Sequence, residues 1–372
     1  MRILLAITKG EIGGAQTHTR ILAQGLQARG HRVGMITESP SALSSALTAG
    51  GAEVIPWASI RPTVDPLADA RARAQLARAV REWCPDVLHL HSSKAGVIGR
   101  RLRPRVATVF TCLHASFGPG RRIRHRLVAR PVEQLTLRHV DGLITIGARD
   151  MPMLRKLAPG TPLALIRNAV PVAGPPASPA APVPVAVWVA RLQHPKDPVQ
   201  AIRSWETVIR RVPDARLLLC GAGPLEGAAR RAAVAGPAAG NVTVLGRVPD
   251  VVEVHRRASV YVLATDVEGG VTMATLEAMA QGLVPVTSDA GDALLLEHAR
   301  CGVVVPRRSP VALGTAVADL FLDESRLRAM RSRALAFARE GWSVDDMVDA
   351  TVDFYEHVLS RHAGTARTAM FA

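Results

Sequence analysis

The sequence is poor in cysteine and in aromatic residues. Only four of its 372 residues are cysteines (Cys84, Cys112, Cys220 and Cys301), far apart and in no CxxC pair, so we expect neither a disulfide scaffold nor a zinc cluster. Scattered thiols are typical of a reducing compartment, and we expect a cytoplasmic protein. Aromatic residues make up 3% and are not interleaved with basic runs. That argues against a surface that stacks nucleic-acid bases, and we expect no nucleic-acid partner.

Long apolar runs and acidic residues are also scarce. The run from Ile3 to Ile7 is shorter than the roughly 7–15 residues of a signal-peptide core, and no run approaches the roughly 20 residues that cross a bilayer. Lys plus Arg number 46 against 31 Asp plus Glu, which gives a net charge of +15. Such a charge suits nucleic acid, an anionic membrane surface or a phosphorylated ligand. A hydrophobic content of 48% excludes a disordered chain.

Short apolar runs alternate with amphipathic helical patterns in the first half of the chain. A first helix is expected at 15–30, and strands are expected at 2–8, 31–37, 51–56, 86–91, 107–112 and 142–146. Near-continuous apolar strands separated by helices predict a parallel sheet that is covered on both faces.

The alternation stops at residues 168–184, which are rich in Pro, Ala and Gly and are typical of an interdomain linker. It restarts with expected strands at 185–190, 215–220, 241–245, 260–264, 284–288 and 302–305. The predicted fold class is therefore α/β, with two doubly wound, Rossmann-like domains whose strand ends face a ligand cleft. The expected boundaries are 1–167 and 185–344 for the domains, 345–360 for a terminal helix and 361–372 for a flexible tail.

Two cations follow the first expected strand of the second domain. Arg191 and Lys196 lie five positions apart, just before the next helical pattern. A guanidinium fork and an ammonium at this place could hold a diphosphate. A solvated pair on a surface loop is the alternative interpretation.

A glycine-rich turn and a carboxylate follow the expected strand at 260–264. Glu268 precedes Gly269, Gly270, Val271 and Thr272, which lead into a helical pattern. Glycines at a helix start let backbone N–H groups approach an anion closely. Glu277 lies further along, in an apolar stretch where a carboxylate needs a partner, and a ribose diol would supply one. An exposed helix residue is the alternative.

Two further turns are compatible with a nucleotide but are less specific. Gly221, Gly223 and Pro224 end an expected strand and would place backbone near a base, although a plain tight turn is the better explanation when this motif is taken alone. Gly13 and Gly14 open the first helix, a second start compatible with phosphate. The GxGxxG fingerprint of dinucleotide sites is absent there.

Histidines gather at expected strand ends. His89 and His91 close one strand, and His114 follows the next. Three histidines at equivalent ends favour a site that hydrogen-bonds a sugar or a developing charge over three purely structural residues. No third and fourth ligand appears at the usual metal spacing and no DxD motif is present, so we expect no metal and no cofactor.

The motifs GGAxxH, ARLxxxKD, GxGPL and ExGG…LEAMAxG, in this order, resemble those of retaining glycosyltransferases of the GT-B fold, the glycosyltransferase group 1 family. The similarity runs from Gly13 to about Tyr355. It implies a nucleotide-sugar donor, UDP- or GDP-linked, and a hydroxyl acceptor. The implied catalytic residues are His114, Arg191, Lys196 and Glu268. The implied donor-binding residues are Gly13, Gly14, Arg191, Lys196, Gly221, Gly223, Pro224, Gly269, Gly270, Val271, Thr272 and Glu277.

Acceptor-binding residues are expected at His18, His91, Ser93 and Lys94, the last three in a segment similar to one in bacterial polysaccharide-building members. Eight residues separate Glu268 from Glu277, where the family usually has seven. Either the loop carries one extra residue or Glu268 does not take the family role. The resemblance also implies that anomeric configuration is retained, that no metal is needed, and that Arg191, Lys196 and the helix start stabilise the leaving diphosphate.

The acceptor is less defined than the donor. Residues 121–137 mix arginines with Ile, Leu and Val, which fits either a basic face on an anionic membrane or a solvated helix. We expect a saccharide or lipid-linked saccharide acceptor, in cell-surface polysaccharide synthesis, and a location at the inner face of the membrane. Three alternatives stay open: transfer to a small soluble metabolite, a nucleotide-sugar epimerase of the same architecture, and a non-catalytic basic binding protein.

Overall fold

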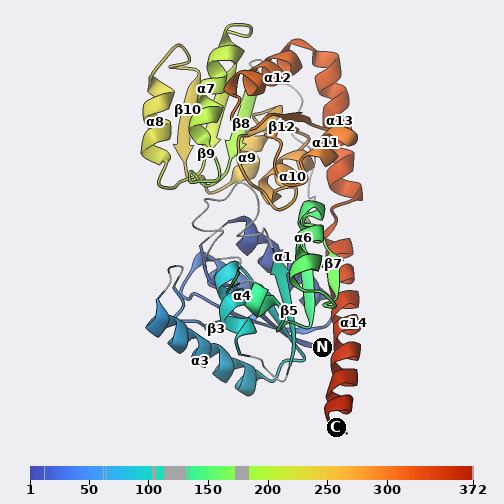
Figure 1. Ribbon diagram of the computed structural model, residues 1–372. Coiled ribbons are helices and arrows are strands. Elements are labelled where there is room, and N and C mark those ends of the chain that lie inside the picture. Colours follow the sequence, from blue (N-terminus) through green and yellow to red (C-terminus); the bar gives the residue numbers. More distant parts are fainter. Residues whose placement is uncertain are drawn as a thin grey trace. The chain divides into compact units, whose positions relative to one another are not determined.

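The computed structural model describes residues 1–11, 13–61, 63, 65–102, 106–112, 131–132, 134–171 and 184–370, with side chains as far as residue 362. Its contacts divide the chain into two compact units (Figure 1). The first unit combines Met1–Ala169 with Val344–Ala372, and the second is Val170–Ser343. His114 and most of the arginine-rich segment 121–137 lie outside the described residues.

The first unit is built on a seven-stranded parallel sheet with the order β3-β2-β1-β4-β5-β6-β7. Its strands are β1 (Arg2–Ala6), β2 (Arg32–Thr37), β3 (Glu53–Pro56), β4 (Val87–His91), β5 (Ala107–Cys112), β6 (Gly142–Thr145) and β7 (Leu163–Leu165). The central strands are buried almost throughout, as expected for a parallel sheet with helices on both faces.

The described helices of this unit are α1 (Gly14–Ala28), α2 (Ala42–Ala49), α3 (Pro66–Trp83), α4 (Ser93–Arg100), the short 3-10 helix η1 (Ala148–Asp150), α6 (Met151–Leu157) and α14 (Val344–Met370). Helix α3 begins where Asp65 accepts a hydrogen bond from Ala68 N and Pro66 takes the first helical position, both favourable at a helix start. None of the described helices is both long enough and apolar enough to cross a membrane.

The C-terminal helix α14 packs on the first unit. Arg29 on α1 forms ion pairs with Asp345, at 3.0 Å, and with Asp349. Further along, the Tyr355 hydroxyl lies 2.5 Å from His89 Nδ1 on β4. The expected flexibility of the tail stays a prediction. The helix, however, continues through residues 361–370, so the expected helix end at 360 was wrong. That stretch contains no proline and is rich in Ala and Arg, which favour a helix.

The second unit has a six-stranded parallel sheet with the order β10-β9-β8-β11-β12-β13. Its strands are β8 (Val185–Val189), β9 (Arg216–Cys220), β10 (Val242–Gly246), β11 (Val260–Leu263), β12 (Val284–Ser288) and β13 (Val303–Val305). Its helices are α7 (Pro198–Ile209), α8 (Glu226–Val234), α9 (Val251–His255), α10 (Met273–Ala280), α11 (Leu294–His298), α12 (Pro310–Leu322) and α13 (Glu324–Glu340). Both sheets confirm the predicted α/β class with two doubly wound units.

Candidate functional site

Four adjacent strands of the second sheet carry polar loops at their carboxyl ends. Arg191 and Lys196 follow β8, Gly221 follows β9, and Glu268 follows β11. The loop after β12, residues 289–292, joins them at the same edge, although no motif in the sequence pointed to it. In an open α/β sheet this edge is where ligands bind.

The structure pairs two of the predicted catalytic residues. Lys196 Nζ donates to Glu268 Oε1, and the two side chains are only 18% and 15% exposed. The same carboxylate oxygen accepts a hydrogen bond of 2.7 Å from Thr265 Oγ1. An ammonium has three N–H donors, so two of those on Lys196 stay available for a ligand.

The loop after β8 is tied to the end of β11. Lys196 and Thr265 form an isolated antiparallel bridge. Asp266 N donates to Pro195 O at 3.0 Å, and Asp197 N donates to Ala264 O at 3.0 Å. These backbone bonds bring Lys196 and Glu268 together although 72 positions separate them. Arg191, at the start of the same loop, is exposed, and its guanidinium makes no hydrogen bond or ion pair to any residue that the structure describes.

The glycine turn after β9 packs closely against the backbone of the Arg191 loop. Gly221 and Gly223 have φ angles of +145° and +155°. A Cβ on Gly221 would lie 1.9 Å from Ala190 O, and one on Gly223 would lie 2.5 Å from Leu192 O. Leu192 N also donates to Ala222 O at 3.0 Å. The close backbone approach therefore explains both glycines without a ligand, and their contact with a nucleotide stays a prediction, as does that of the exposed Pro224.

Helix α10 begins later than the glycine pair. Gly269, Gly270 and Val271 are buried in the loop before it, and Thr272 is the N-cap, with its hydroxyl accepting from Thr275 N at 3.2 Å. Glu277 lies half-buried on this helix. Tyr261 on β11 lies beneath: burial raises the pKa of its hydroxyl above the ordinary range, and the charges of Glu268 and Glu277 add to the rise.

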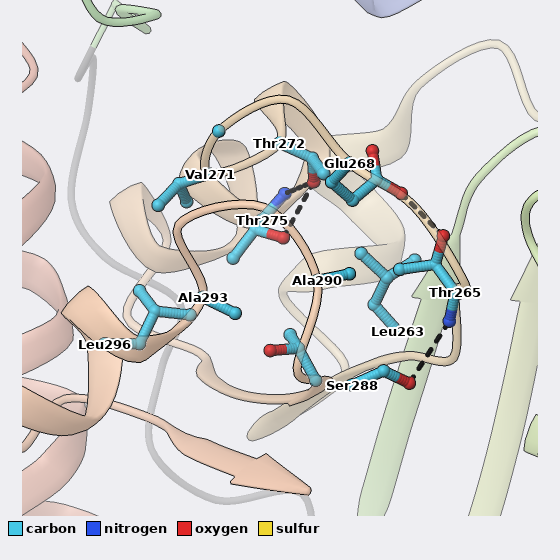
Figure 2. Close-up of a pocket in the computed structure, with 12 residues that line it drawn as sticks. Leu263, Thr265, Glu268, Val271, Thr272, Thr275, Ser288, Ala290, Ala293 and Leu296 are labelled. Carbon is cyan, nitrogen blue, oxygen red and sulfur yellow. Dashed lines mark hydrogen bonds between the residues drawn. The ribbon is translucent and has the colours of Figure 1, made fainter. Parts of the chain in front are cut away.

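A small cavity lies behind the Glu268 loop (Figure 2). Its volume is about 10 Å³, about the space of one water molecule. Its wall includes Leu263, Thr265, Glu268, Gly270, Val271, Thr272, Thr275, Thr287, Ser288, Ala290, Ala293 and Leu296. Gly291, in the loop after β12, packs closely against the Glu268 loop. Its φ is +58°, and a Cβ added there would lie 2.7 Å from Gly270 O and 2.9 Å from Glu268 Cβ. A glycine three positions after the end of β12 is the signal in the sequence that could have identified it.

Two arginines brace the start of the same loop. Arg308 donates to the Asp266 carboxylate from Nε, at 3.1 Å, and from a terminal nitrogen, at 2.7 Å. This guanidinium lowers the pKa of Asp266. Arg307 donates to Asp266 O at 3.2 Å. Neither arginine was predicted as a site residue, because both follow β13, which lies beyond β12 in the sheet.

In the first unit, Gly13 is the N-cap of α1 and Gly14 its first residue, as predicted. Gly13 is extended, with φ at −177°, and no described side chain caps the helix. Among the described residues, the first backbone N–H groups therefore have no side-chain acceptor, as an anion site requires. Their contact with a phosphate stays a prediction.

Three histidines of the first unit are packed together, His18 on α1 and His89 and His91 on β4. The ring centroids of His89 and His91 are 4.0 Å apart, and those of His18 and His91 are 5.8 Å apart. Their exposed fractions are 4% for His18, 1% for His89 and 0% for His91. Burial lowers the pKa of His18 to about 4 and that of His89 to about 3, and it holds the pKa of His91 well below its usual value.

The partners of this cluster differ. His89 lies between the Tyr355 hydroxyl and Thr111 Oγ1, at 2.5 and 2.6 Å. Neither ring nitrogen of His91 has a hydrogen-bond partner among the described residues. Lys94 is paired with Asp69 at 2.6 Å and donates to Thr63 O at 2.8 Å. The acceptor-binding roles of His18, His91, Ser93 and Lys94 stay predictions, and in this structure His18 and His91 are closed off from solvent.

The described residues contain no group of three or more His, Cys, Asp or Glu side chains placed to hold a metal ion. The described cysteines are all free thiols.

Two sequence models match the chain. The model described as glycosyl transferases group 1 matches residues 183–323, and the glycosyl transferase 4-like domain matches residues 13–169. A GDP-mannose-dependent alpha-(1-6)-phosphatidylinositol monomannoside mannosyltransferase of Mycobacterium tuberculosis is 28% identical over 180 residues, 46% of this chain and 47% of that protein, so the chain matches about half of that relative. A phosphatidyl-myo-inositol mannosyltransferase of the same species is 26% identical over 359 residues, 89% of this chain and 90% of that protein.

Solved structures share the architecture of this chain. Anabaena HepE in complex with UDP-glucose superposes with a TM-score of 0.82 at 18% identity, over 96% of this chain and 100% of that one. Sucrose-phosphate synthase of Thermosynechococcus elongatus gives a TM-score of 0.80 at 17% identity, over 97% and 99%. At these identities the likeness shows the fold.

Proposed function

The chain belongs to the glycosyl transferases group 1 family and has its GT-B fold, and we propose that it transfers a sugar from a nucleoside-diphosphate sugar to a hydroxyl acceptor. The observation that carries the proposal is the edge of the second sheet. There, among the described residues, the Arg191 guanidinium has no partner and Lys196 keeps two N–H donors unused beside the half-buried Glu268. Two cations at the carboxyl edge of a parallel sheet fit a diphosphate.

The cations act on the leaving group. When the bond between the anomeric carbon and the diphosphate oxygen breaks, the electron pair stays on that oxygen and the sugar gains oxocarbenium character. Arg191 and Lys196 stabilise the growing negative charge on that oxygen. Charge compensation by these side chains makes the transfer metal-independent.

Retention follows if the acceptor attacks from the face that the diphosphate leaves. The acceptor oxygen then bonds to the anomeric carbon, and its proton passes to the departing phosphate oxygen. Glu268 faces the donor sugar and holds Lys196, and Glu277 on α10 binds the ribose diol. The leaving group serves as the base in this scheme, so no protein carboxylate has to attack the sugar.

The acceptor is proposed to be a saccharide or a lipid-linked saccharide. The two mycobacterial relatives are by name mannosyltransferases that act on phosphatidylinositol compounds, which supports GDP-mannose as a donor and a lipid-borne acceptor. The excess of basic residues supports contact with an anionic membrane surface, where each cation adds about 1 kcal/mol.

Nucleotide binding and transfer test the proposal separately. A ligand at a hundred times its Kd stabilises the folded state by about 2.7 kcal/mol, so GDP or UDP should raise the melting temperature and AMP should not. The purified chain is then incubated with GDP-mannose or UDP-glucose, with and without a lipid extract as acceptor. NMR of the product reports its anomeric configuration, and EDTA tests metal dependence. A product formed from the donor alone would indicate an epimerase, and the absence of nucleotide binding would refute the proposal.

A further inference from the structure

We propose that Thr265 is a positioning residue that fixes which oxygen of Glu268 is presented to the donor. The inference rests on the role proposed for Glu268 above. Thr265 touches the carboxylate but is not expected to touch the sugar, since it is only 2% exposed.

The carboxylate of Glu268 is bound on one side only. Oε1 accepts from both Thr265 Oγ1, at 2.7 Å, and Lys196 Nζ. Oε2 makes no hydrogen bond to any residue that the structure describes. Figure 2 shows the bonded oxygen turned toward Thr265 and the other turned away from it. One oxygen is thus held by the protein and the other is left for a ligand.

Thr265 is itself held rigidly. Its backbone N donates to Ser288 Oγ at 3.2 Å, and its backbone forms the isolated antiparallel bridge with Lys196. Its hydroxyl also lies 3.3 Å from Pro195 O and 3.4 Å from Val267 O, but a hydroxyl has one proton, and the charged oxygen at 2.7 Å is the strongest acceptor. The hydroxyl therefore points at Glu268 from a fixed place.

Lys196 alone would not hold the carboxylate during the reaction. Its ammonium sits on a flexible four-carbon stem, and the proposed donor brings a diphosphate that competes for its N–H groups. Gly291 restrains the Glu268 stem, because a Cβ there would already collide with Glu268 Cβ, but it offers the carboxylate no hydrogen bond. Once the ammonium turns toward phosphate, Thr265 is the partner that remains.

The test compares Thr265→Val, Thr265→Ser and Thr287→Val. Valine has the shape of threonine without the hydroxyl, and serine keeps the hydroxyl. Thr287 is the matched control: it lines the same cavity, is 3% exposed, and its hydroxyl has no partner among the described residues. Crystal structures give the orientation of the Glu268 carboxylate, and steady-state kinetics with calorimetry give kcat, KM and the Kd for the free nucleoside diphosphate.

In Thr265→Val we expect a changed Glu268 orientation and a kcat about tenfold lower, the usual scale for losing a hydrogen bond to a charged group, with KM and nucleotide Kd within about twofold. Thr265→Ser should restore both orientation and kcat, and Thr287→Val should alter neither. An unmoved carboxylate in Thr265→Val overturns the inference, as does an unchanged kcat or an equal loss in Thr287→Val. If the wild type transfers no sugar, the proposed function fails, whereas the orientation comparison still decides whether Thr265 positions Glu268.

Discussion

Lys196 Nζ, in the loop after β8, forms an ion pair with the carboxylate of Glu268, in the loop after β11. The pair is largely buried, with side-chain exposures of 18% and 15%, so each charge depends on the other more than a surface pair would. A ligand diphosphate would compete with Glu268 for the ammonium. Under the proposed function, donor binding would therefore change the hydrogen bonding of the Glu268 carboxylate.

The first prediction concerns the two cations of this edge. We expect Arg191→Ala and Lys196→Ala each to lower the turnover of sugar transfer by roughly 10²–10³, comparable to removing one donor from an oxyanion hole. Arg203→Ala is the matched control, since Arg203 is exposed on α7 of the same unit and has no ion pair among the described residues. If both site variants kept wild-type turnover, the cations would not be stabilising the leaving group.

The second prediction concerns the glycine turn beneath Arg191. Gly223→Ala should destabilise the second unit by at least about 2 kcal/mol and weaken nucleotide binding, because its Cβ would meet Leu192 O at 2.5 Å in a strained backbone region. Gly227→Ala on α8 is the control: its Cβ would meet only Arg231, at 3.4 Å, and alanine favours a helix by about 0.5–1 kcal/mol. Denaturant unfolding with and without GDP measures both effects. Equal stability of the two variants would contradict the proposed close packing.

Much of the fold could be predicted from the sequence because buried parallel strands are continuous apolar runs. β5 and β12 begin and end at the expected residues. β7 was missed because it has three residues, all half-buried, and so carries no run long enough to recognise. The end of α14 was misplaced because composition near a terminus does not reveal where a helix stops.

The contacts within the candidate site could not be predicted from the sequence. Lys196 and Glu268 were both assigned to one site, yet their pairing depends on β8 and β11 being neighbours in the sheet, and the sequence carries no record of that order. Gly291 was not predicted because it acts through its close approach to the Glu268 loop, which the sequence does not reveal. Thr265 was not predicted because it acts through its hydrogen bond to Glu268, three positions away. The burial of His91 was missed because its strand stays covered to its last residue.

The third prediction concerns membrane binding. The chain should float with anionic vesicles at low salt and detach as salt rises, since screening shortens the reach of surface charges to about 10 Å at 0.1 M. Replacing Arg121, Arg122, Arg124 and Arg126 by Gln should lower the affinity for vesicles more than 100-fold, because each cation near the surface contributes about 1 kcal/mol to binding. The same change at four exposed arginines of the second unit, Arg203, Arg257, Arg326 and Arg339, removes equal charge and should have a smaller effect. Arg100 is not used, because it is fully buried with its guanidinium over Phe110.

The fourth prediction concerns pH and the buried histidines of the first unit. In the unfolded chain these rings take up a proton near their ordinary pKa of about 6.5, whereas the folded pKa values are about 4 for His18 and about 3 for His89, and that of His91 is also strongly lowered. Below pH 6.5 the unfolded state therefore binds more protons than the folded state. The free energy of unfolding should fall as pH falls from about 6.5 toward 4, by about 1 kcal/mol per pH unit for each histidine, and should be insensitive to these groups above pH 7.

His255 in the second unit is also buried, and its pKa is lowered to about 4. Substitution of His91 distinguishes the contribution of the first-unit cluster to the pH dependence from that of His255. His91→Asn removes one buried titrating ring, so its stability should decline less steeply between pH 6.5 and 4.5 than that of the wild type. His357→Asn removes an exposed ring from α14 and should leave the slope unchanged. Urea unfolding at half-unit pH steps measures the three slopes. If the free energy of unfolding of His91→Asn fell with pH as steeply as that of the wild type, His91 would already be protonated in the folded protein. A partner would then have to compensate its buried charge.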